Sequence, residues 1–189
     1  MGDQGCSELL VQDTATKLFQ TAALLLGNES DAVSLVEEAI AGTEVDPCAD
    51  GEKAKVLVQD QLVQAAIRKL NELDPESFTV SGNVEGQGGC IQDDDISATG
   101  LSQEQLLYLV EGQGRGQLRS WLEHLPSAQR AIFVERAMLG QDNIATAANL
   151  RAGGKNAAGW TPEKVSEVFR QALCSLATSL VHSGSEQPA

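Results

Sequence analysis

Apolar residues recur every three or four positions along most of this chain, which is the spacing that places them on one face of an α-helix. Three such segments occupy the first part of the sequence, over residues 7–26, 30–40 and 52–73. No alternating strand pattern of useful length interrupts them, so the sequence predicts an all-α fold. The buried positions expected in the second and third segments are Ala32, Leu35, Val36, Ala39, Ile40, Val56, Leu62, Val63, Ala66, Ile67 and Leu70.

Local signals mark where these helices begin and end. Gly27 follows the first helix as a C-terminal glycine, and Asn28 or Ser30 can cap the second. A proline stops the third, because it disfavours helical geometry in the residue before it. Three helices of this length can pack as a compact bundle, which we expect to span residues 1–75.

Residues 76–101 differ from the helices on either side in composition. They include five glycines within the twenty residues 81–100 and a run of three aspartates at 93–95. Glycine makes a chain flexible, and like charges make it repel itself. The segment therefore predicts a flexible linker and the boundary between two domains.

A second helical domain is expected over residues 102–183, followed by a disordered tail at 184–189. It opens at a capping-box pair, Ser102 and Gln105. A polar turn at 151–160 separates its last two helices, which makes a helix–turn–helix candidate. The helices before the final one are expected over residues 103–110, 117–124, 126–139 and 143–150. In the last of these, the positions expected to face inward are Ile144, Ala147, Ala148 and Leu150.

Charge is distributed unevenly along the 189 residues, whose formal net charge is −14. Residues 1–100 hold 5 Lys/Arg and 19 Asp/Glu, whereas residues 101–189 hold 8 of each. Between Arg115 and Arg170 the balance is +3. The first half should therefore repel phosphate, while the later helices can tolerate it.

The chemistry-bearing residues give no sign of an active site. Cys6, Cys48, Cys90 and Cys174 are widely scattered, and two histidines cannot complete a zinc-ligand spacing with them. We therefore expect reduced thiols, no metal and no cofactor. A glycine-rich stretch at 112–116 follows no strand, so it is better explained as a turn than as a phosphate-binding loop. The sequence predicts no enzyme and no small-molecule substrate.

Nothing in the sequence indicates a membrane. The longest uninterrupted apolar run, residues 22–26, is far shorter than a bilayer requires. The N-terminal region lacks the basic and apolar pattern of a signal peptide. We therefore expect a soluble, cytoplasmic protein without a membrane partner.

Two stretches in a fixed order have the pattern of a known family. The first is LFQTAALLLGNESDAVSLVEEAI, with a leucine-rich helix, a Gly-Asn turn and a D-A-x-x-L-V-x-E helix. The second is LRSWLEHLPSAQRAIFVERAMLGQDNIATAANL, with Leu-Pro-x-x-x-Arg, a Phe-containing helix, a glycine and I-A-x-x-x-x-L. Together they cover about half of the chain. They resemble the N-terminal and C-terminal domains of bacterial RNA polymerase sigma factors of the sigma-70 family, in its extracytoplasmic-function branch.

The resemblance implies two interfaces and their partners. One is a docking surface for core RNA polymerase on the D-A-x-x-L-V-x-E helix, and the other contacts promoter DNA through the helix–turn–helix. An anti-sigma regulator is a third candidate partner. The polymerase-binding residues implied are Asp31, Leu35, Val36 and Glu38. The DNA-binding residues implied are Arg151, Lys155, Thr161, Lys164 and Arg170.

A sigma-derived protein-interaction module that has lost promoter melting or DNA binding is the alternative. Melting requires aromatic faces for unstacked bases and cations for phosphates. The helix over 52–73 contains four cations but no aromatic residue. The final helix also carries Glu163 and Glu167, which would repel DNA. Independently of this choice, the charged residues of both interfaces can also be interpreted as ordinary solvated surface groups.

Overall fold

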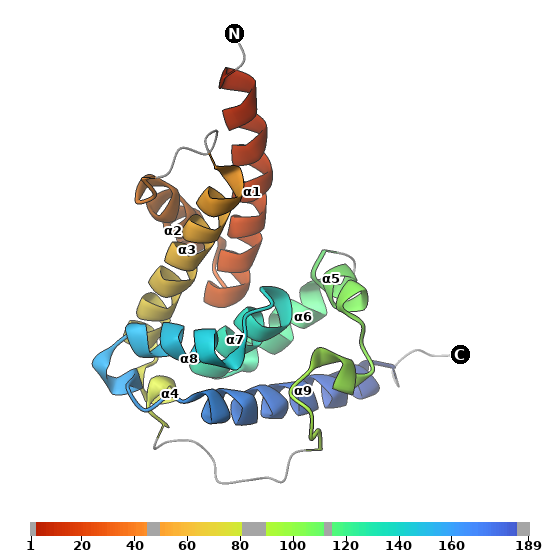
Figure 1. Cartoon of the computed structure of the whole chain (residues 1–189). Helices are drawn as coiled ribbons and strands as arrows, with labels where there is room; N and C mark the ends of the chain where they lie inside the picture. The colour runs from red at the N-terminus through yellow and green to blue at the C-terminus, as the bar shows by residue number, and fades with distance from the viewer. Residues whose placement is uncertain (1–2, 45–49, 81–89, 112–114, 185–189) are drawn as a thin grey trace.

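The computed structural model describes residues 3–44, 50–80, 90–111 and 115–184, and every element within these ranges is helical (Figure 1). The predicted all-α fold is therefore confirmed for the described part of the chain. The η elements are short 3-10 helices, except η3, which is a π-helix. In chain order the elements are α1 (Asp3–Leu26), α2 (Glu29–Ala41), α3 (Gly51–Leu73), α4 (Pro75–Phe78), η2 (Ile96–Thr99), α5 (Gln103–Glu111), α6 (Arg115–His124), α7 (Ser127–Phe133), η3 (Val134–Met138), α8 (Asn143–Ala152), η4 (Lys155–Ala157) and α9 (Pro162–Gly184).

Helices α1, α2 and α3 pack against one another and stand above a layer formed by α7, α8 and α9 (Figure 1). The junction between α1 and α2 forms as its sequence predicts. Gly27 adopts a φ of 70°, which a side chain would oppose. The side chain of Asn28 then accepts hydrogen bonds from the backbone N–H groups of Ser30 and Asp31, capping α2.

The C-terminal half also shows most of its predicted boundaries, with two departures. Arg115 and Gly116, which were expected in a turn, belong to α6. Ser102 and Gln105 exchange the two hydrogen bonds of a capping box, at 2.8 and 3.1 Å. The helix expected over 126–139 is not uniform, because α7 widens into η3, where the N–H of Leu139 donates to the carbonyl of Val134 five residues earlier. π-Turns of this kind occur mostly as single insertions in α-helices.

Four positions predicted to be buried are exposed, and their prediction was wrong. Ile40 and Val56 are 38% and 57% exposed. They lie towards the ends of α2 and α3 that are remote from the C-terminal helices (Figure 1). Ile144 (67% exposed) and Ala148 lie on the solvent side of α8, whereas the predictions for Ala147 and Leu150 are confirmed, since both are buried together with Thr146. Because α8 has apolar residues on more than one face, periodicity alone does not separate its buried positions from its exposed ones.

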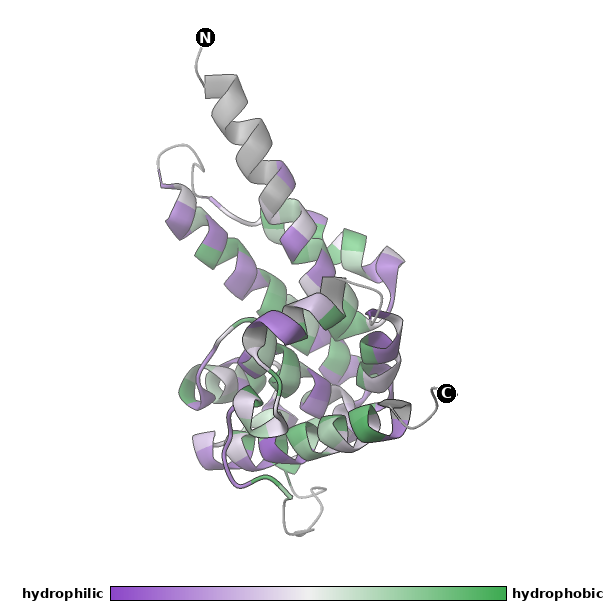
Figure 2. Ribbon diagram, turned by 90° about the vertical axis from the view of Figure 1, so that its right-hand side faces the viewer, coloured by the Kyte–Doolittle hydropathy of each residue, from purple (hydrophilic) through white to green (hydrophobic). Residues whose placement is uncertain are grey.

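The buried side chains of both halves form one hydrophobic cluster. Figure 2 shows hydrophobic and hydrophilic residues alternating along the described helices, as expected of helices that bury one face. In the C-terminal half this core contains Phe133, whose ring packs edge-on against Trp121 at 4.9 Å between centroids. Phe133 also lies 6.2 Å from Phe169 of α9. Three of the seven aromatic residues of the chain thus lie where α6, α7 and α9 meet.

The turn between α8 and α9 rests on α3. A Cβ atom on Gly153 would lie 2.5 Å from Cγ2 of Ile67, so only glycine allows this approach. Beside it, the side-chain amides of Asn71 and Asn156 donate to each other at 2.9 and 2.7 Å. Asn71 also donates to the carbonyl of Gly153 at 3.1 Å. Asn71 is 6% exposed whereas Asn156 is exposed, so the buried member of the pair is the one whose amide would be costly to leave unpaired.

Both described ends of the segment 76–101 contact the C-terminal helices. Phe78 is fully buried, and its carbonyl accepts a hydrogen bond from the indole N–H of Trp160 at 2.8 Å. Ile91 is 8% exposed, and η2 packs on α9. Residues 81–89, the centre of the predicted linker, and 185–189 of the predicted tail lie outside the described residues.

Cys90 and Cys174 form a disulfide, so the expectation of reduced thiols was wrong for this pair. The two residues are 84 positions apart in sequence, yet their Cα atoms lie 5.7 Å apart, within the usual range for a disulfide. Widely spaced cysteines give no local pattern, and only the packing of the segment around Ile91 against α9 brings these two together. The cysteine of α9 is therefore a cross-link and not simply a small buried hydrophobe.

None of the described helices combines the length and apolarity needed to cross a bilayer.

We predict that Asn71→Ala will lower the free energy of unfolding by about 1–3 kcal/mol, because it removes the hydrogen bonds that Asn71 makes with Asn156 and with the carbonyl of Gly153. Urea unfolding followed by circular dichroism measures the change. Glu72→Ala, at the exposed neighbouring position of α3, is the control and should cost much less. Equal effects of the two substitutions would show that the amide pair does not hold α3 to the turn.

Candidate functional site

The predicted polymerase-binding residues divide into two groups on α2. Leu35 and Val36 are 5% and 7% exposed and belong to the core, so their side chains position the helix. Glu38 is exposed, and Asp31 is partly exposed and pairs with Lys69 of α3 at 2.9 Å. The structure therefore offers an acidic outer face of α2, built from the polar members of the predicted set.

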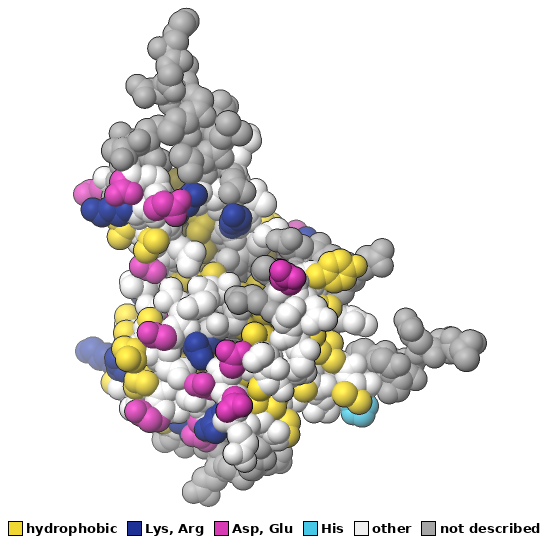
Figure 3. Space-filling model, turned by 45° about the vertical axis from the view of Figure 1, so that its right-hand side comes forward, with side chains coloured by type: hydrophobic (Ala, Val, Ile, Leu, Met, Phe, Trp, Pro, Cys, Tyr) yellow, Lys and Arg dark blue, Asp and Glu magenta, His cyan; other side chains and the backbone are white. Residues whose placement is uncertain are grey.

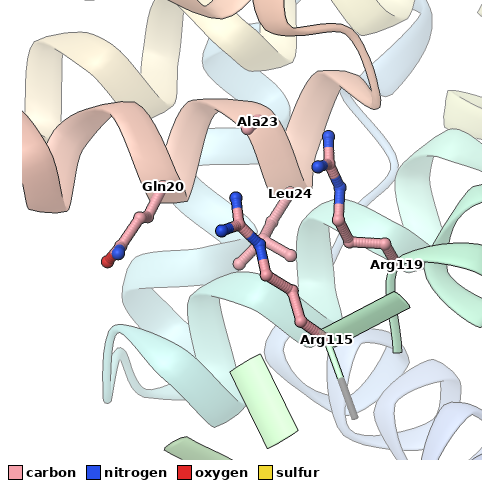
Figure 4. A pocket seen from close by; sticks show the side chains of 5 residues that line it. All are labelled: Gln20, Ala23, Leu24, Arg115 and Arg119. Carbon is pink, nitrogen blue, oxygen red and sulfur yellow. The ribbon is translucent and has the colours of Figure 1, made fainter. Parts of the chain in front are cut away.

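The start of α2 is also tied to the C-terminal half. Glu29 pairs with Arg119 of α6 at 3.2 Å. Figure 4 shows Arg119 beside Arg115, next to Gln20, Ala23 and Leu24 of α1. The space between them is only about 10 Å³, which admits a water molecule at most. We therefore assign these arginines to the contact between α6 and the α1–α2 junction.

The motif arginine of Leu-Pro-x-x-x-Arg has a structural role. The Arg130 guanidinium donates to the backbone carbonyls of Leu122, Glu123 and Leu125 at the end of α6, and to that of Leu25 near the end of α1. These carbonyls would otherwise be the unpaired acceptors of helix C-termini. Arg130 therefore joins the N-terminal unit to the C-terminal helices.

The predicted DNA-binding residues lie around the turn between α8 and α9. Arg151 and Lys155 are exposed, although one guanidinium nitrogen of Arg151 donates to the carbonyl of Trp160 at 2.7 Å. Thr161 caps α9, since its hydroxyl accepts from the N–H of Lys164 at 3.2 Å. The structure thus brings two exposed cations to the end of α8 and the turn, and an exposed hydroxyl to the start of α9.

The two cations further along α9 are engaged within the chain. Nζ of Lys164 pairs with Glu167 at 3.0 Å. The Arg170 guanidinium donates to the carbonyls of Ser166 and Gln92, at 3.4 and 3.3 Å. Figure 3 shows positive and negative side chains interspersed over its visible face. Lys164 and Arg170 therefore do not form a free basic strip along α9.

An unexpected polar cluster joins residues 90–101 to the C-terminal helices. The carboxylate of Asp94 accepts from the side-chain amide of Asn143 at 2.8 Å and lies 3.8 Å from a guanidinium nitrogen of Arg136. Hydrogen bonds from Asn143 and then Ser166, with the charge of Arg136, hold the pKa of Asp94 below its usual range. Sequence reasoning missed this cluster because the acidic run was assigned to a linker.

Glu135 is a buried acid inside η3. Its side chain is fully buried, and its one described partner is the amide of Asn149, which donates at 2.7 Å. The second carboxyl oxygen has no hydrogen-bond partner among the described residues. Burial raises the pKa of Glu135 to about 8; the Asn149 hydrogen bond opposes this shift, and the negative charge of Asp60 on α3 adds to it. At neutral pH the folded chain therefore holds a protonated glutamic acid in its core.

A cleft of about 530 Å³ lies between α4, the start of α7 and α9. This volume is within the range of small-molecule pockets. Two of its polar groups are already used to cap α7: Asp74 accepts from the N–H of Ser127 at 3.3 Å, and the Ser77 hydroxyl from that of Ala128 at 3.1 Å. Among the described residues, no group of three His, Cys, Asp or Glu side chains is placed to hold a metal.

No family model, curated protein or solved structure matches this chain. The resemblance to sigma factors therefore rests on the two sequence motifs, and family membership stays a prediction. In the structure the first motif lies on α1 and α2, and the second extends from α6 to α8.

The raised pKa of Glu135 predicts that Glu135→Gln will increase the free energy of unfolding by an amount that depends on pH. Because the folded-state pKa, about 8, lies above the ordinary value of 4.5, the folded state binds more protons than the unfolded state between these values. In the wild-type chain, the stabilisation that Glu135 contributes is complete below about pH 4.5 and is lost as the pH rises to about 8. The neutral amide does not ionise, so the variant should gain up to about 3–5 kcal/mol over wild type across this window.

The measurement is the free energy of unfolding from urea denaturation at pH 4.5, 6, 7 and 8.5. Glu37→Gln, on the exposed side of α2, serves as the matched control. A difference between Glu135→Gln and wild type that stays constant with pH would show that Glu135 is ionised in the folded chain.

Proposed function

We propose that the chain is a divergent sigma-like transcription initiation factor. In this proposal residues 1–75 form the unit that docks on core RNA polymerase, and residues 102–183 form the unit that contacts promoter DNA, with residues 76–101 between them. The support is the order of the two sigma-like motifs together with the helices on which they fall. The resemblance implies helices at these positions, and the structure has helices there.

The exposed cations at the α8–α9 turn are the observation that carries the DNA-binding part. A helix–turn–helix presents the start of its second helix to the major groove while neighbouring residues contact phosphates. Here Arg151 lies near the end of α8, Lys155 lies in η4, and Thr161 precedes α9. All three are exposed, so the end of the C-terminal unit that would approach DNA carries suitable donors.

The outer face of α2 supports the polymerase-binding part. Its buried side, with Leu35 and Val36, fixes the helix on α1 and α3, and its outer side carries exposed Glu38. A polar face on a rigid helix is suited to a basic or polar partner helix. The burial of α2 against both neighbours means that such docking would need no unfolding of the helix.

A protein-interaction module is the second candidate, and a specific observation favours it. Lys164 is paired with Glu167, and Arg170 is bound to backbone carbonyls, so neither presents a free charge along α9. The turn itself packs on α3 through Asn156. On this proposal the sigma-like scaffold binds polymerase or a regulator without melting DNA. A melted bubble in open-complex footprinting would exclude it.

Lys155→Ala is expected to weaken binding to double-stranded DNA uniformly across sequences. If Lys155 binds one phosphate, the substitution should reduce the slope of log affinity against log salt by about 1. Fluorescence anisotropy with a labelled promoter duplex, measured from 50 to 200 mM salt, gives this slope. Lys53→Ala, an exposed lysine in the first turn of α3, is the matched control. If Lys155→Ala and Lys53→Ala change the slope equally, the turn is not part of the DNA interface.

Glu38→Lys is expected to reduce capture of core RNA polymerase, because it reverses the charge at the exposed position of the docking helix. Pull-down with purified core enzyme and tagged chain measures the retained fraction. Glu72→Lys reverses a charge on the exposed side of α3 and should leave capture unchanged. If the wild-type chain captures no polymerase, the proposal of a sigma-like initiation factor fails.

A further inference from the structure

Residues 90–101, which we name the acidic strap, are bound along α9 at regular intervals. Cys90 is bonded to Cys174, and the carbonyl of Gln92 accepts from Arg170. The Asp94 carboxylate then bonds to Ser166. Each advance of two residues along the strap is thus matched by a shift of four residues towards the start of α9. Because the partners on α9 have decreasing residue numbers as the strap proceeds from Cys90 to Asp94, the strap runs antiparallel to α9.

At the end of this run, Asp94 meets donors from three elements. Arg136 comes from η3, Asn143 from the first position of α8, and Ser166 from α9. Arg136 also donates to the Asp94 backbone carbonyl at 2.9 Å, while its guanidinium carbon lies 4.9 Å from the centre of the Phe169 ring. The ring packs against one side of the guanidinium. One terminal nitrogen of Arg136 is directed at the strap, and the other donates to the carbonyl of Gln141 at 2.7 Å.

The donors around Asp94 are of the kind that binds oxyanions. A guanidinium and a side-chain amide donate at fixed angles, and a hydroxyl adapts to either role. A carboxylate and a phosphate offer these donors the same feature, which is a pair of oxygens carrying negative charge. Arg170 lies one helical turn beyond Ser166 and is held by the Gln92 carbonyl of the same strap. The strap therefore engages two of the eight cations of residues 101–189.

We propose that Arg136, Asn143 and Arg170 form a binding site for the backbone phosphates of DNA. In the disulfide-bonded chain the Asp94 carboxylate fills this site, and the strap competes with DNA for it. The inference rests on the proposed function, because the site flanks the α8–α9 unit to which DNA binding is ascribed. It also explains why Arg170 is not free on the surface of α9.

The disulfide sets how strongly the strap competes. It anchors the strap four residues from Asp94, so the carboxylate is present at high effective concentration next to its donors. Without the disulfide, the remaining attachment comes from buried Ile91, the packing of η2 and these polar contacts. A DNA duplex, with many phosphates and greater charge, then competes on more favourable terms.

Opening the disulfide needs an external dithiol reductant. Its thiolate attacks one sulfur of the bond, and the Cys90–Cys174 bond breaks while a mixed disulfide forms. The second thiolate of the reductant resolves the mixed disulfide. Two electrons pass from the dithiol to the chain, the two cysteines take up two protons, and the reductant leaves as its own disulfide. Because Cys90 is exposed, such a reductant can reach the bond.

The test measures DNA binding by anisotropy with a labelled 20-base-pair duplex at 50 mM salt. Compared with the oxidised wild-type chain, we expect roughly ten-fold or tighter binding for the dithiol-reduced chain, for Cys90→Ser combined with Cys174→Ser, and for Asp94→Asn. Adding Arg136→Gln or Arg170→Gln to the cysteine double variant should reverse the gain and reduce the salt slope by about 1 for each cation.

Asp93→Asn is the matched control, because it removes the same charge from an exposed neighbour in the strap. It should change affinity far less than Asp94→Asn. Asp94→Asn keeps the disulfide and therefore tests the site even if removal of the cross-link unfolds the chain, which circular dichroism detects. Equal affinities for oxidised, reduced and Asp94→Asn chains would overturn the inference, as would equal effects of Asp93→Asn and Asp94→Asn.

Inorganic pyrophosphate, titrated by calorimetry, separates this inference from the proposed function. Binding to the Asp94→Asn chain that disappears with Arg136→Gln supports the phosphate site, even if no form of the chain binds the duplex; the DNA-binding proposal alone then fails. Duplex binding that is unaffected by Asp94, Arg136 and Arg170 supports the DNA-binding proposal and overturns the inference.

Discussion

The contact of α3 with the turn between α8 and α9 fixes the relative position of all the candidate surfaces. Gly153 lets the turn approach Ile67, and the paired amides of Asn71 and Asn156 close the interface. Because Asn71 is buried, the contact cannot slide without leaving its side-chain amide unpaired. The outer face of α2 and the start of α9 consequently belong to one packed structure.

Much of the positive charge of the C-terminal half is used inside the chain. Arg130 pairs the carbonyls at two helix ends, Arg136 binds the acidic strap, and Lys164 binds its own helix neighbour. Such charge-assisted hydrogen bonds are stronger than those between neutral groups, so these cations are held in place. A charge count therefore overstates what is available to an external phosphate, and any DNA contact depends on which internal partners can be displaced.

The surroundings of Glu135 and Asp94 shift the pKa of a carboxyl group in opposite directions. Glu135 is surrounded by the core with one amide partner, so it is held neutral. Asp94 is partly exposed and has several donors, so it is held charged. Both acids contact residues of α8, Asn149 and Asn143.

The sequence by itself determined the elements of this protein: Asn28, Ser102 and Thr161 cap helices through local hydrogen bonds, and Gly27 and Gly140 adopt the positive φ that their helix ends require. These features depend on neighbours within a few positions, so they can be predicted locally. Only the tertiary structure decided that Ile144 faces solvent and that Cys90 reaches Cys174. It also decided that Asp94 of the acidic run binds Arg136. Pairings between residues tens of positions apart depend on how whole helices pack, which no local pattern of residues encodes.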